Sequence, residues 1–175
     1  MAYHSQQSCE GVQTVCNCPI LPLKGKTRGI APPFTGAEEE RDIVDEAIYY
    51  FKANVLFKSF EVKSPADRLL VYLTLHISKC LVSLKGEKTL EGGIRNLQSL
   101  ARGEVPLPGD AGFHLGGFFQ APRSGSERDT MRKYLKQLME EVAARLPLLY
   151  FTGPDGGPNK YWSSFAKRRF LNIKV

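Results

Sequence analysis

Residues 64–84 read SPADRLLVYLTLHISKCLVSL, and this stretch decides the fold. Ser64 is a favourable helix cap, Pro65 fits the first helical position, and Asp67 returns a carboxylate to the cap. Apolar side chains then cover nearly the whole circumference of the predicted helix: Leu69, Leu70, Val71, Tyr72, Leu73, Leu75, Ile77, Leu81, Val82 and Leu84. A helix that is apolar on all sides has to be surrounded by protein. Because the burial of these side chains contributes on the order of 15–30 kcal/mol, we predict a central helix over about residues 65–84.

Weaker helical patterns lie on either side of this stretch. Thr35 and Glu38 form a capping-box pattern, and further acidic residues crowd the expected first turn. Apolar residues then recur at spacings of three and four, which predicts a helix as far as about Phe57. Another helix is predicted over residues 90–100, although two adjacent glycines lower its helix propensity.

Two more helices are predicted toward the C-terminus. An amphipathic pattern runs from Ser126 to Leu146, and Pro147 is expected to end that helix. The last helix is expected to carry an apolar face made of Trp162, Phe165, Ala166 and Phe170. The predicted fold class is therefore mainly α, with about five helices, in which one central apolar helix (about 65–84) is surrounded by the others.

The first 36 residues differ in character from the rest of the chain. They show no sustained hydrophobic period and contain several prolines, which predicts an extended N-terminal arm over residues 1–36. Residues 37–175 then form a single helical domain, large enough to bury a core of its own. A segment without a hydrophobic period of its own becomes ordered only when it lies on another surface. We therefore expect that residues 1–23 can be deleted without unfolding this domain.

The loop over residues 105–126 is rich in proline and glycine and carries three phenylalanines, Phe113, Phe118 and Phe119. Such a loop either inserts its aromatic rings into the core or offers them to a partner. The sequence leaves both possibilities open.

The chain is basic, with a net charge of +6 and an isoelectric point of about 9.2. Part of the excess gathers at Lys167, Arg168 and Arg169 near the C-terminus. Such a cluster is a solvated helix end that complements the helix dipole, or a patch that binds an acidic partner. Charge alone does not distinguish the two.

A search for catalytic and metal-binding patterns finds none. The chain lacks phosphate-binding glycine loops and the serine nucleophile motif, so we expect no enzyme activity and no cofactor. His76 and Cys80 are four residues apart on the predicted central helix, but a helix enclosed by protein gives a substrate no access. His4 and the N-terminal cysteines lack the spacing of a zinc site, so no metal is expected.

No secretory signal is recognised, which favours a reducing compartment and free thiols. The central helix is read as too short to span a membrane.

Several stretches together resemble a known family. They are Ala2-Tyr3-His4-Ser5, residues 19–23 (PILPL), residues 42–55 (DIVDEAIYYFKANV), residues 66–68 (ADR), residues 105–109 (VPLPG) and residues 159–168 (NKYWSSFAKR). In this order they resemble the subunit 3 family of the actin-related protein 2/3 complex. The resemblance spans nearly the whole chain, and it implies a mainly helical protein in which one helix is surrounded by the others.

The resemblance also implies a function. It predicts a non-catalytic structural subunit that contributes to the nucleation of branched actin filaments and to binding of the mother filament, in the cytoplasm and the actin-rich cell cortex. The implied partners are the other subunits of the complex, especially actin-related protein 3, and the actin filament. No nucleic acid and no membrane insertion are expected. The alternative is a basic nucleic-acid-binding protein, because Lys160-Tyr161-Trp162 mixes basic and aromatic residues.

Partner contacts are predicted on three surfaces. The first is the arm around Tyr3 and Pro22, the second is the pair Phe118 and Phe119, and the third is the basic C-terminal segment. The candidate residues are Tyr3, Pro22, Phe118, Phe119, Lys167, Arg168 and Arg169.

Overall fold

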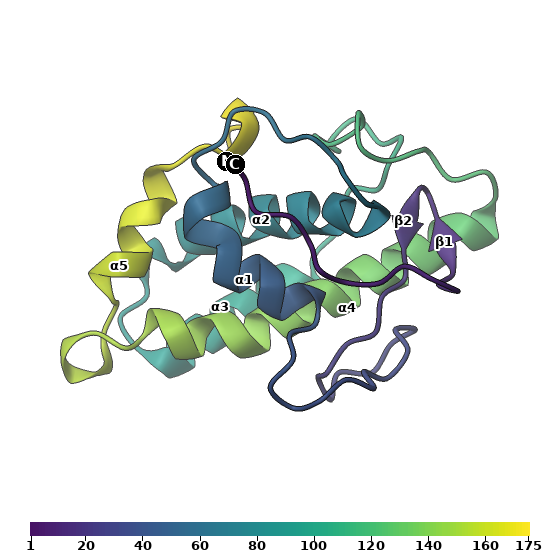
Figure 1. Ribbon diagram of the computed structural model, residues 1–175. Helices are drawn as coiled ribbons and strands as arrows, with labels where there is room; N and C mark the ends of the chain where they lie inside the picture. Colours follow the sequence, from purple (N-terminus) through teal and green to yellow (C-terminus); the bar gives the residue numbers. More distant parts are fainter.

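The chain folds around one central helix, as the computed structural model of residues 1–175 shows (Figure 1). The main elements are β1 (Thr14–Val15), β2 (Cys18–Pro19), α1 (Ile43–Asn54), α2 (Pro65–Ser83), α3 (Leu90–Arg102), α4 (Gly125–Tyr150) and α5 (Lys160–Ser163). Four 3₁₀ turns accompany them: η1 (Leu84–Gly86), η2 (Pro154–Gly156), η3 (Ser164–Lys167) and η4 (Phe170–Asn172). The predicted mainly α fold class is confirmed.

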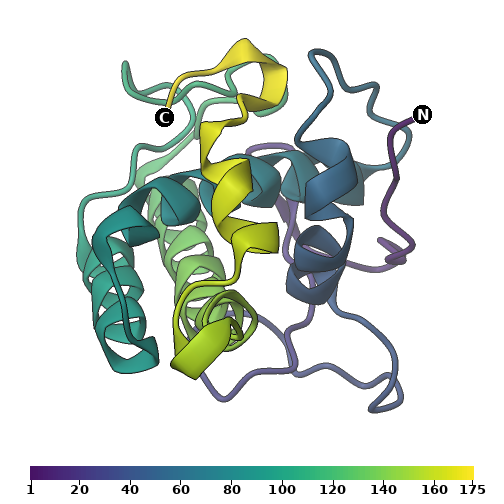
Figure 2. The same cartoon turned by 90° about the vertical axis from the view of Figure 1, so that its left-hand side faces the viewer.

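Helix α2 is the core helix that its sequence predicts. In Figure 2, α1 lies on one side of α2, α3 and α4 lie below it, and the C-terminal segment crosses it. Leu69, Leu70, Leu73 and Leu81 of α2 are all fully buried. By length and composition alone, Pro65–Gly86 is also apolar enough to cross a membrane, but 67% of its most apolar 18-residue part is buried inside the protein. This burial is what a core helix requires.

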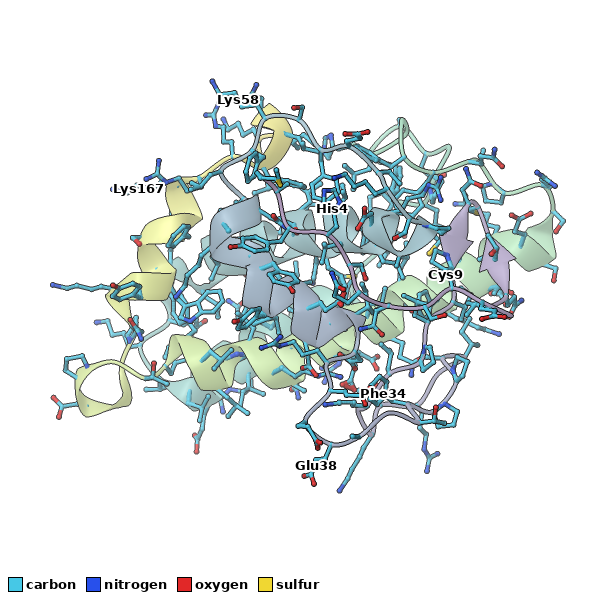
Figure 3. All side chains as sticks on the ribbon, viewed as in Figure 1. His4, Cys9, Phe34, Glu38, Lys58 and Lys167 are labelled. Carbon is cyan, nitrogen blue, oxygen red and sulfur yellow. The ribbon has the colours of Figure 1, made fainter.

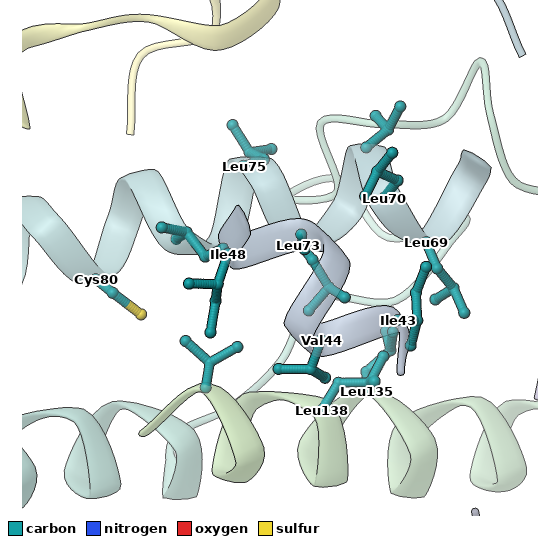
Figure 4. Packing of buried hydrophobic residues seen from close by; sticks show 14 of the residues in the cluster. Ile43, Val44, Ile48, Leu69, Leu70, Leu73, Leu75, Cys80, Leu135 and Leu138 are labelled. Carbon is teal, nitrogen blue, oxygen red and sulfur yellow. The ribbon is translucent and has the colours of Figure 1, made fainter. Parts of the chain in front are cut away.

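Helix α1 fills the space between α2 and α4. Figure 4 shows Ile43 and Val44 of α1 among the leucines of the two longer helices, beside Leu73 of α2 and Leu138 of α4. All four side chains are fully buried. The apolar stripe of α1 is therefore the part of its sequence that determines where the helix packs.

The start of α1 differs from the prediction. The capping box at Thr35 is not used, and the helix begins at Ile43, with Asp42 as its cap. The Asp42 carboxylate accepts a hydrogen bond from the Asp45 N–H at 2.9 Å. Residues 37–42 are mostly charged, so they have no apolar face to bury, and the helix starts where the apolar stripe starts.

The cap of α2 also differs in detail. Pro65 occupies the first helical position as predicted, but the Ser64 hydroxyl makes no capping hydrogen bond and has no partner in the protein. The Asp67 carboxylate instead accepts the Lys63 N–H at 2.9 Å, one residue before the cap. Its other oxygen accepts the N–H of Ser5 from the arm. Asp67, predicted to stabilise the start of α2, thus also binds the N-terminal arm.

Pro147 does not end its helix. Helix α4 continues to Tyr150, although the proline cannot donate a backbone hydrogen bond. Leu146, Pro147 and Tyr150 are all buried, so packing outweighs the loss of one hydrogen bond. The predicted last helix, in contrast, is broken into α5, η3 and η4, with extended backbone at Arg168. The chain bends there because Phe170 turns inward, where it is 1% exposed.

The N-terminal arm packs onto the helices and contributes to their core. It gives buried side chains at Val15, Cys16, Cys18, Ile20, Leu21 and Leu23. The Tyr134 hydroxyl of α4 donates to the Leu21 carbonyl at 3.0 Å and accepts the Leu21 N–H at 2.9 Å. The division into an arm, residues 1–36, and a domain, residues 37–175, stays a prediction. The burial of so many arm residues argues against the expectation that residues 1–23 are dispensable for folding.

The first residues of the arm are held by buried polar side chains. The Tyr3 N–H donates to Asn54 at 2.8 Å, and the Ser5 N–H donates to Asp67 at 2.8 Å. The Ser5 hydroxyl donates to Glu46 at 2.6 Å. Because Asn54, Glu46 and Asp67 are almost wholly buried, removing the arm leaves polar atoms of Asn54 and Glu46 and one oxygen of Asp67 without partners.

We expect Leu73→Asp to abolish folding, because a charge in the centre of α2 without a partner costs several kcal/mol, comparable with the stability of a whole domain. Circular dichroism of the purified chain measures this. The matched control is Leu56→Asp, at a side chain that is 54% exposed, and it should melt close to the wild type. A soluble Leu73→Asp chain with an unchanged melting temperature would show that α2 is not the centre of the fold.

We also expect removal of residues 1–23 to lower the melting temperature strongly or to leave the chain unfolded. The deletion exposes apolar core, removes the hydrogen bonds that the arm donates to the Glu46 carboxylate and leaves Asp67 with only the Lys63 N–H, which together cost several kcal/mol. Removing Met1 alone is the control, because that side chain is fully exposed. A truncated chain that melts like the wild type would contradict this expectation.

Candidate partner-binding surfaces

His76 and Cys80 form a contact inside the core. The His76 Nε2 atom lies 3.4 Å from the Cys80 Sγ atom, and both residues are buried. Burial, with a smaller contribution from the charge of Lys79, lowers the pKa of His76 to about 3. Burial likewise raises the pKa of the Cys80 thiol, so the thiolate that nucleophilic catalysis needs is disfavoured. The condition for a His–Cys enzyme, an open cleft lined by the pair, is not met.

Two of the N-terminal cysteines, Cys16 and Cys18, belong to the small hairpin. Cys16 and Asn17 connect β1 to β2 with φ angles of 52° and 63°, as the turn of a tight hairpin requires. Burial raises the pKa of Cys16 to about 11, and burial also raises the pKa of Cys18. No group of three or more His, Cys, Asp or Glu side chains in the chain is arranged to hold a metal ion.

The arm candidates Tyr3 and Pro22 both lie on the side of the protein where Tyr50 of α1 is found. The ring of Tyr3 is 53% exposed and stacks on the ring of Tyr50, with 4.9 Å between the ring centroids. Tyr50 and the half-buried Pro22 line one hollow of about 540 Å³. The structure therefore brings these two predicted residues to one side of the protein, where Tyr3 is the more accessible.

The two loop phenylalanines have different environments. Phe119 is only 5% exposed, and its ring meets Phe113 and Tyr72 edge to face, with ring centroids 5.7 and 6.4 Å apart. Phe118 is half-buried. Of the two possibilities for the loop, insertion into the core or presentation to a partner, Phe119 adopts the first, and its ring is not accessible to a partner.

The basic candidates Lys167, Arg168 and Arg169 are all exposed, but they do not share a helix. Lys167 ends η3, and Arg168 and Arg169 follow in extended backbone. The Leu171 N–H donates to the Phe57 carbonyl at 3.0 Å, which brings the exposed Lys58 to the same region. Figure 3 shows Lys58 and Lys167 directed away from the body of the protein. We call Lys58, Lys167, Arg168 and Arg169 the basic ridge.

The structure also reveals a surface that the sequence analysis missed, a groove of about 390 Å³ between α1, α4 and α5. We call it the aromatic groove. Its lining residues are Lys24, Glu39, Glu40, Arg41, Asp45, Ile48, Tyr49, Lys52, Arg145, Leu149 and Trp162. Tyr49 is 62% exposed and Leu149 is 43% exposed. Tyr49 lies off the buried stripe of α1, and an aromatic residue on the polar face was the signal that could have found the groove.

Comparison with known proteins agrees with the resemblance seen in the sequence. The P21-Arc family, described as the ARP2/3 complex ARPC3 (21 kDa) subunit, matches residues 1–175. A relative from Arabidopsis thaliana, named actin-related protein 2/3 complex subunit 3, is 45% identical, with 100% of this chain and 99% of the relative covered. Proteins of the same name from Schizosaccharomyces pombe and Dictyostelium discoideum are 42% and 41% identical, with 98% of this chain covered in each case and 97% and 98% of the relatives. The chain belongs to the P21-Arc family.

In this P21-Arc chain an ion cluster under the aromatic groove joins α1 to α4. The Arg145 guanidinium donates to both oxygens of Asp42, at 2.7 and 2.8 Å, and to Asp45 and Glu141 at 2.8 and 3.1 Å. Burial alone would raise the pKa of Asp42, but the hydrogen bonds and the charge of Arg145 outweigh it and lower that pKa. The cluster thus holds α1 against α4, the two walls of the groove, through residues that lie 103 positions apart in the sequence.

The buried His76 of this P21-Arc chain makes stability depend on pH. Its pKa is about 3 in the folded chain and about 6.5 in the unfolded chain, so below pH 6.5 the unfolded chain binds the extra proton. The free energy of unfolding should therefore fall on acidification, by about 1.4 kcal/mol per pH unit between about pH 6 and pH 4.

Urea unfolding at several pH values measures this slope. His76→Gln is the matched variant, because it removes the titrating group while keeping a polar side chain of similar size. We expect its slope over the same range to be flatter than that of the wild type. Identical slopes for the two chains would show that His76 is not the group responsible.

Proposed function

We propose that the chain is a non-catalytic structural subunit of the actin-related protein 2/3 complex, and that it contributes to the nucleation of branched actin filaments. The observation that carries the proposal is the family match over residues 1–175, together with relatives that are named as subunit 3 of that complex and covered nearly end to end. Such a protein acts in the cytoplasm, in the actin cytoskeleton of the cell cortex.

Two features of the chain support a structural role over a catalytic one. The pair His76 and Cys80 is sealed in the core, where a substrate cannot reach it. The chain instead offers exposed surfaces of the kind that bind proteins: the ring of Tyr3, the basic ridge and the aromatic groove.

The partners we propose are the other subunits, especially actin-related protein 3, and the side of the mother filament. Actin filaments are acidic, and the basic ridge is the surface whose charge fits them. Its cations are exposed and make no ion pair within the chain. The segment that follows the ridge is anchored by the hydrogen bond from the Leu171 N–H to the Phe57 carbonyl at 3.0 Å. Leu171 and Asn172 there have positive φ, a conformation that disfavours most side chains and is often kept where function needs it.

The nucleic-acid alternative loses support. A base needs an exposed aromatic face on which to stack. Trp162 is only 8% exposed and packs against Phe51, with 6.0 Å between the ring centroids. Tyr161 is 75% exposed, but the Lys52 ammonium lies 5.0 Å from the centroid of its ring and 4.4 Å from that of Trp162, so the motif offers one accessible ring rather than a stacking platform. We therefore propose no nucleic-acid binding.

The proposal is tested by reversing two charges of the ridge, Arg168→Glu together with Arg169→Glu, in a reconstituted complex. We expect incorporation of the subunit, or co-sedimentation of the complex with actin filaments, to fall about tenfold and to become less sensitive to salt, since fewer ionic contacts remain.

The matched control is Lys26→Glu together with Arg28→Glu, an exposed basic pair on the arm, which should leave assembly and filament binding within twofold of the wild type. Melting temperatures of the isolated chains report any loss of stability. If both double variants assemble and promote branching like the wild type, the ridge is only a solvated surface. If the wild-type chain itself fails to join the actin-related subunits, the proposed function is wrong.

A further inference from the structure

The aromatic groove carries an inference of its own, which rests on the proposed function. We propose that the groove docks an amphipathic segment of another subunit of the same complex. Apolar side chains of that segment lie against Tyr49 and Leu149. A carboxylate of the segment meets Lys52 at one end of the groove, and a cation meets Glu39 and Glu40 at the other.

The first argument is the exposed apolar surface around the groove. The large hydrophobic side chains that remain exposed in the chain are Met1, Tyr3, Ile30, Tyr49, Leu56, Leu148, Leu149 and Tyr161. Half of them, Tyr49, Leu148, Leu149 and Tyr161, come from the three helices that meet at the groove, and two of these, Tyr49 and Leu149, line it. Scattered apolar residues need no explanation, but a gathered patch beside a hollow marks an interaction site.

The second argument is that the groove is already formed. Trp162 stacks on the buried Phe51, which fixes one end of the floor. The Arg41 guanidinium lies 3.6 Å from the centroid of the Tyr49 ring and holds its orientation. Lys52 lies 4.4 Å from the centroid of Trp162. Tyrosine, tryptophan and arginine in a rigid setting are the residues that contribute most to protein interfaces, because little entropy is lost when they bind.

The third argument is the distribution of charge along the groove. Glu39 and Glu40 are exposed at one end and make no ion pair within the chain, and Lys52 at the other end makes none either. Between them, Asp45 is neutralised by Lys24 at 3.6 Å and by Arg145 at 2.8 Å. Arg41 lines the groove beside these two glutamates, so that end carries two carboxylates and one cation. The groove therefore has a net acidic end, a neutral middle and a basic end.

This pattern selects the occupant. Along α1, Asp45 and Lys52 are seven residues apart, which corresponds to about 10 Å, or two helical turns. This is the distance from the neutral middle to the basic end, and Glu39 and Glu40 lie beyond Asp45. A segment longer than two turns, apolar in the middle and oppositely charged at its ends, matches the groove and can lie in it in only one direction. A lipid surface is anionic throughout, and Glu39 and Glu40 would repel it.

The experiment uses the assembled complex, purified with the wild-type chain. A carbodiimide joins a lysine amine to a carboxylate in direct contact, without a spacer. We expect mass spectrometry to find Lys52 joined to an aspartate or glutamate of a different subunit, within a segment that also carries apolar residues. Cross-linking of Lys52 to a second copy of this chain, or to no other subunit at all, would overturn the proposal.

Substitutions give the second measurement. Leu149→Ser should weaken incorporation of the chain into the complex at least tenfold, and Lys52→Glu should do the same. Lys52→Glu should recover when the cross-linked carboxylate of the partner is changed to lysine. The matched controls are Leu56→Ser, at an exposed leucine outside the groove, and Lys26→Glu, at an exposed lysine of the arm, and both should stay within twofold of the wild type.

Each result bears on one of the two proposals. If the wild-type chain assembles and the groove variants assemble equally well, the groove inference is wrong while the proposed function stands. If the wild-type chain does not assemble, both fail. Leu149 is exposed, so isolated Leu149→Ser should keep the melting temperature of the wild type, whereas Lys52→Glu loses the contacts with Tyr161 and Trp162 and should melt slightly lower. Weaker assembly with an unchanged melting temperature therefore supports docking rather than loss of fold.

Discussion

Helix α2 carries apolar side chains on every side, and all of them have to be kept from water. No single neighbour can cover a helix all round, so the structure uses several. Helix α1 lies on one side, α3 and α4 on another, and the hairpin of the arm and the C-terminal turns cover what remains. Phe119 of the proline-rich loop closes a further gap beside Tyr72. The burial of one helix thus explains why segments without a period of their own, such as the arm, are ordered.

Buried carboxylates connect these covering segments. A carboxylate inside a protein is tolerated only when its oxygens are paired or hydrogen-bonded. Asp67 and Glu46 meet this requirement with backbone and hydroxyl groups of the arm, and Asp42 meets it with Arg145 of α4. Each carboxylate stands near the start of α1 or α2 and binds a segment that is distant in sequence. The polar contacts therefore select which surface segment lies where, while the apolar core provides the driving force.

The surfaces that we propose for partners follow from the same arrangement. The C-terminal segment crosses α2, and Phe170 turns inward to complete the core. That path leaves the cations of the basic ridge on the outside, next to Lys58, and it places α5 against α1, where Trp162 closes one end of the aromatic groove. The chemistry of the buried His76 and Cys80 is suppressed by the same burial that stabilises the fold. The interior contributes stability and shape, and the accessible groups are those suited to binding.

The sequence by itself determined the central helix, the fold class and the family. The apolar pattern of residues 64–84 and the family-like stretches each consist of residues that are close together in the chain, so they can be recognised without knowing the tertiary contacts. Only the tertiary structure decided the ends of the helices and the groove. Helix α1 starts at Ile43, with Asp42 as its cap, because the apolar stripe that packs on α2 and α4 starts there, and Arg145, 103 residues away, pairs with that cap. Helix α4 continues past Pro147 because Tyr150 finds a buried site. The aromatic groove joins Tyr49, Leu149 and Trp162, which share no local pattern. A sequence shows the local spacing of apolar residues and the helix propensity of each residue. The energies that fixed the helix ends and the groove come instead from contacts between residues far apart in the chain.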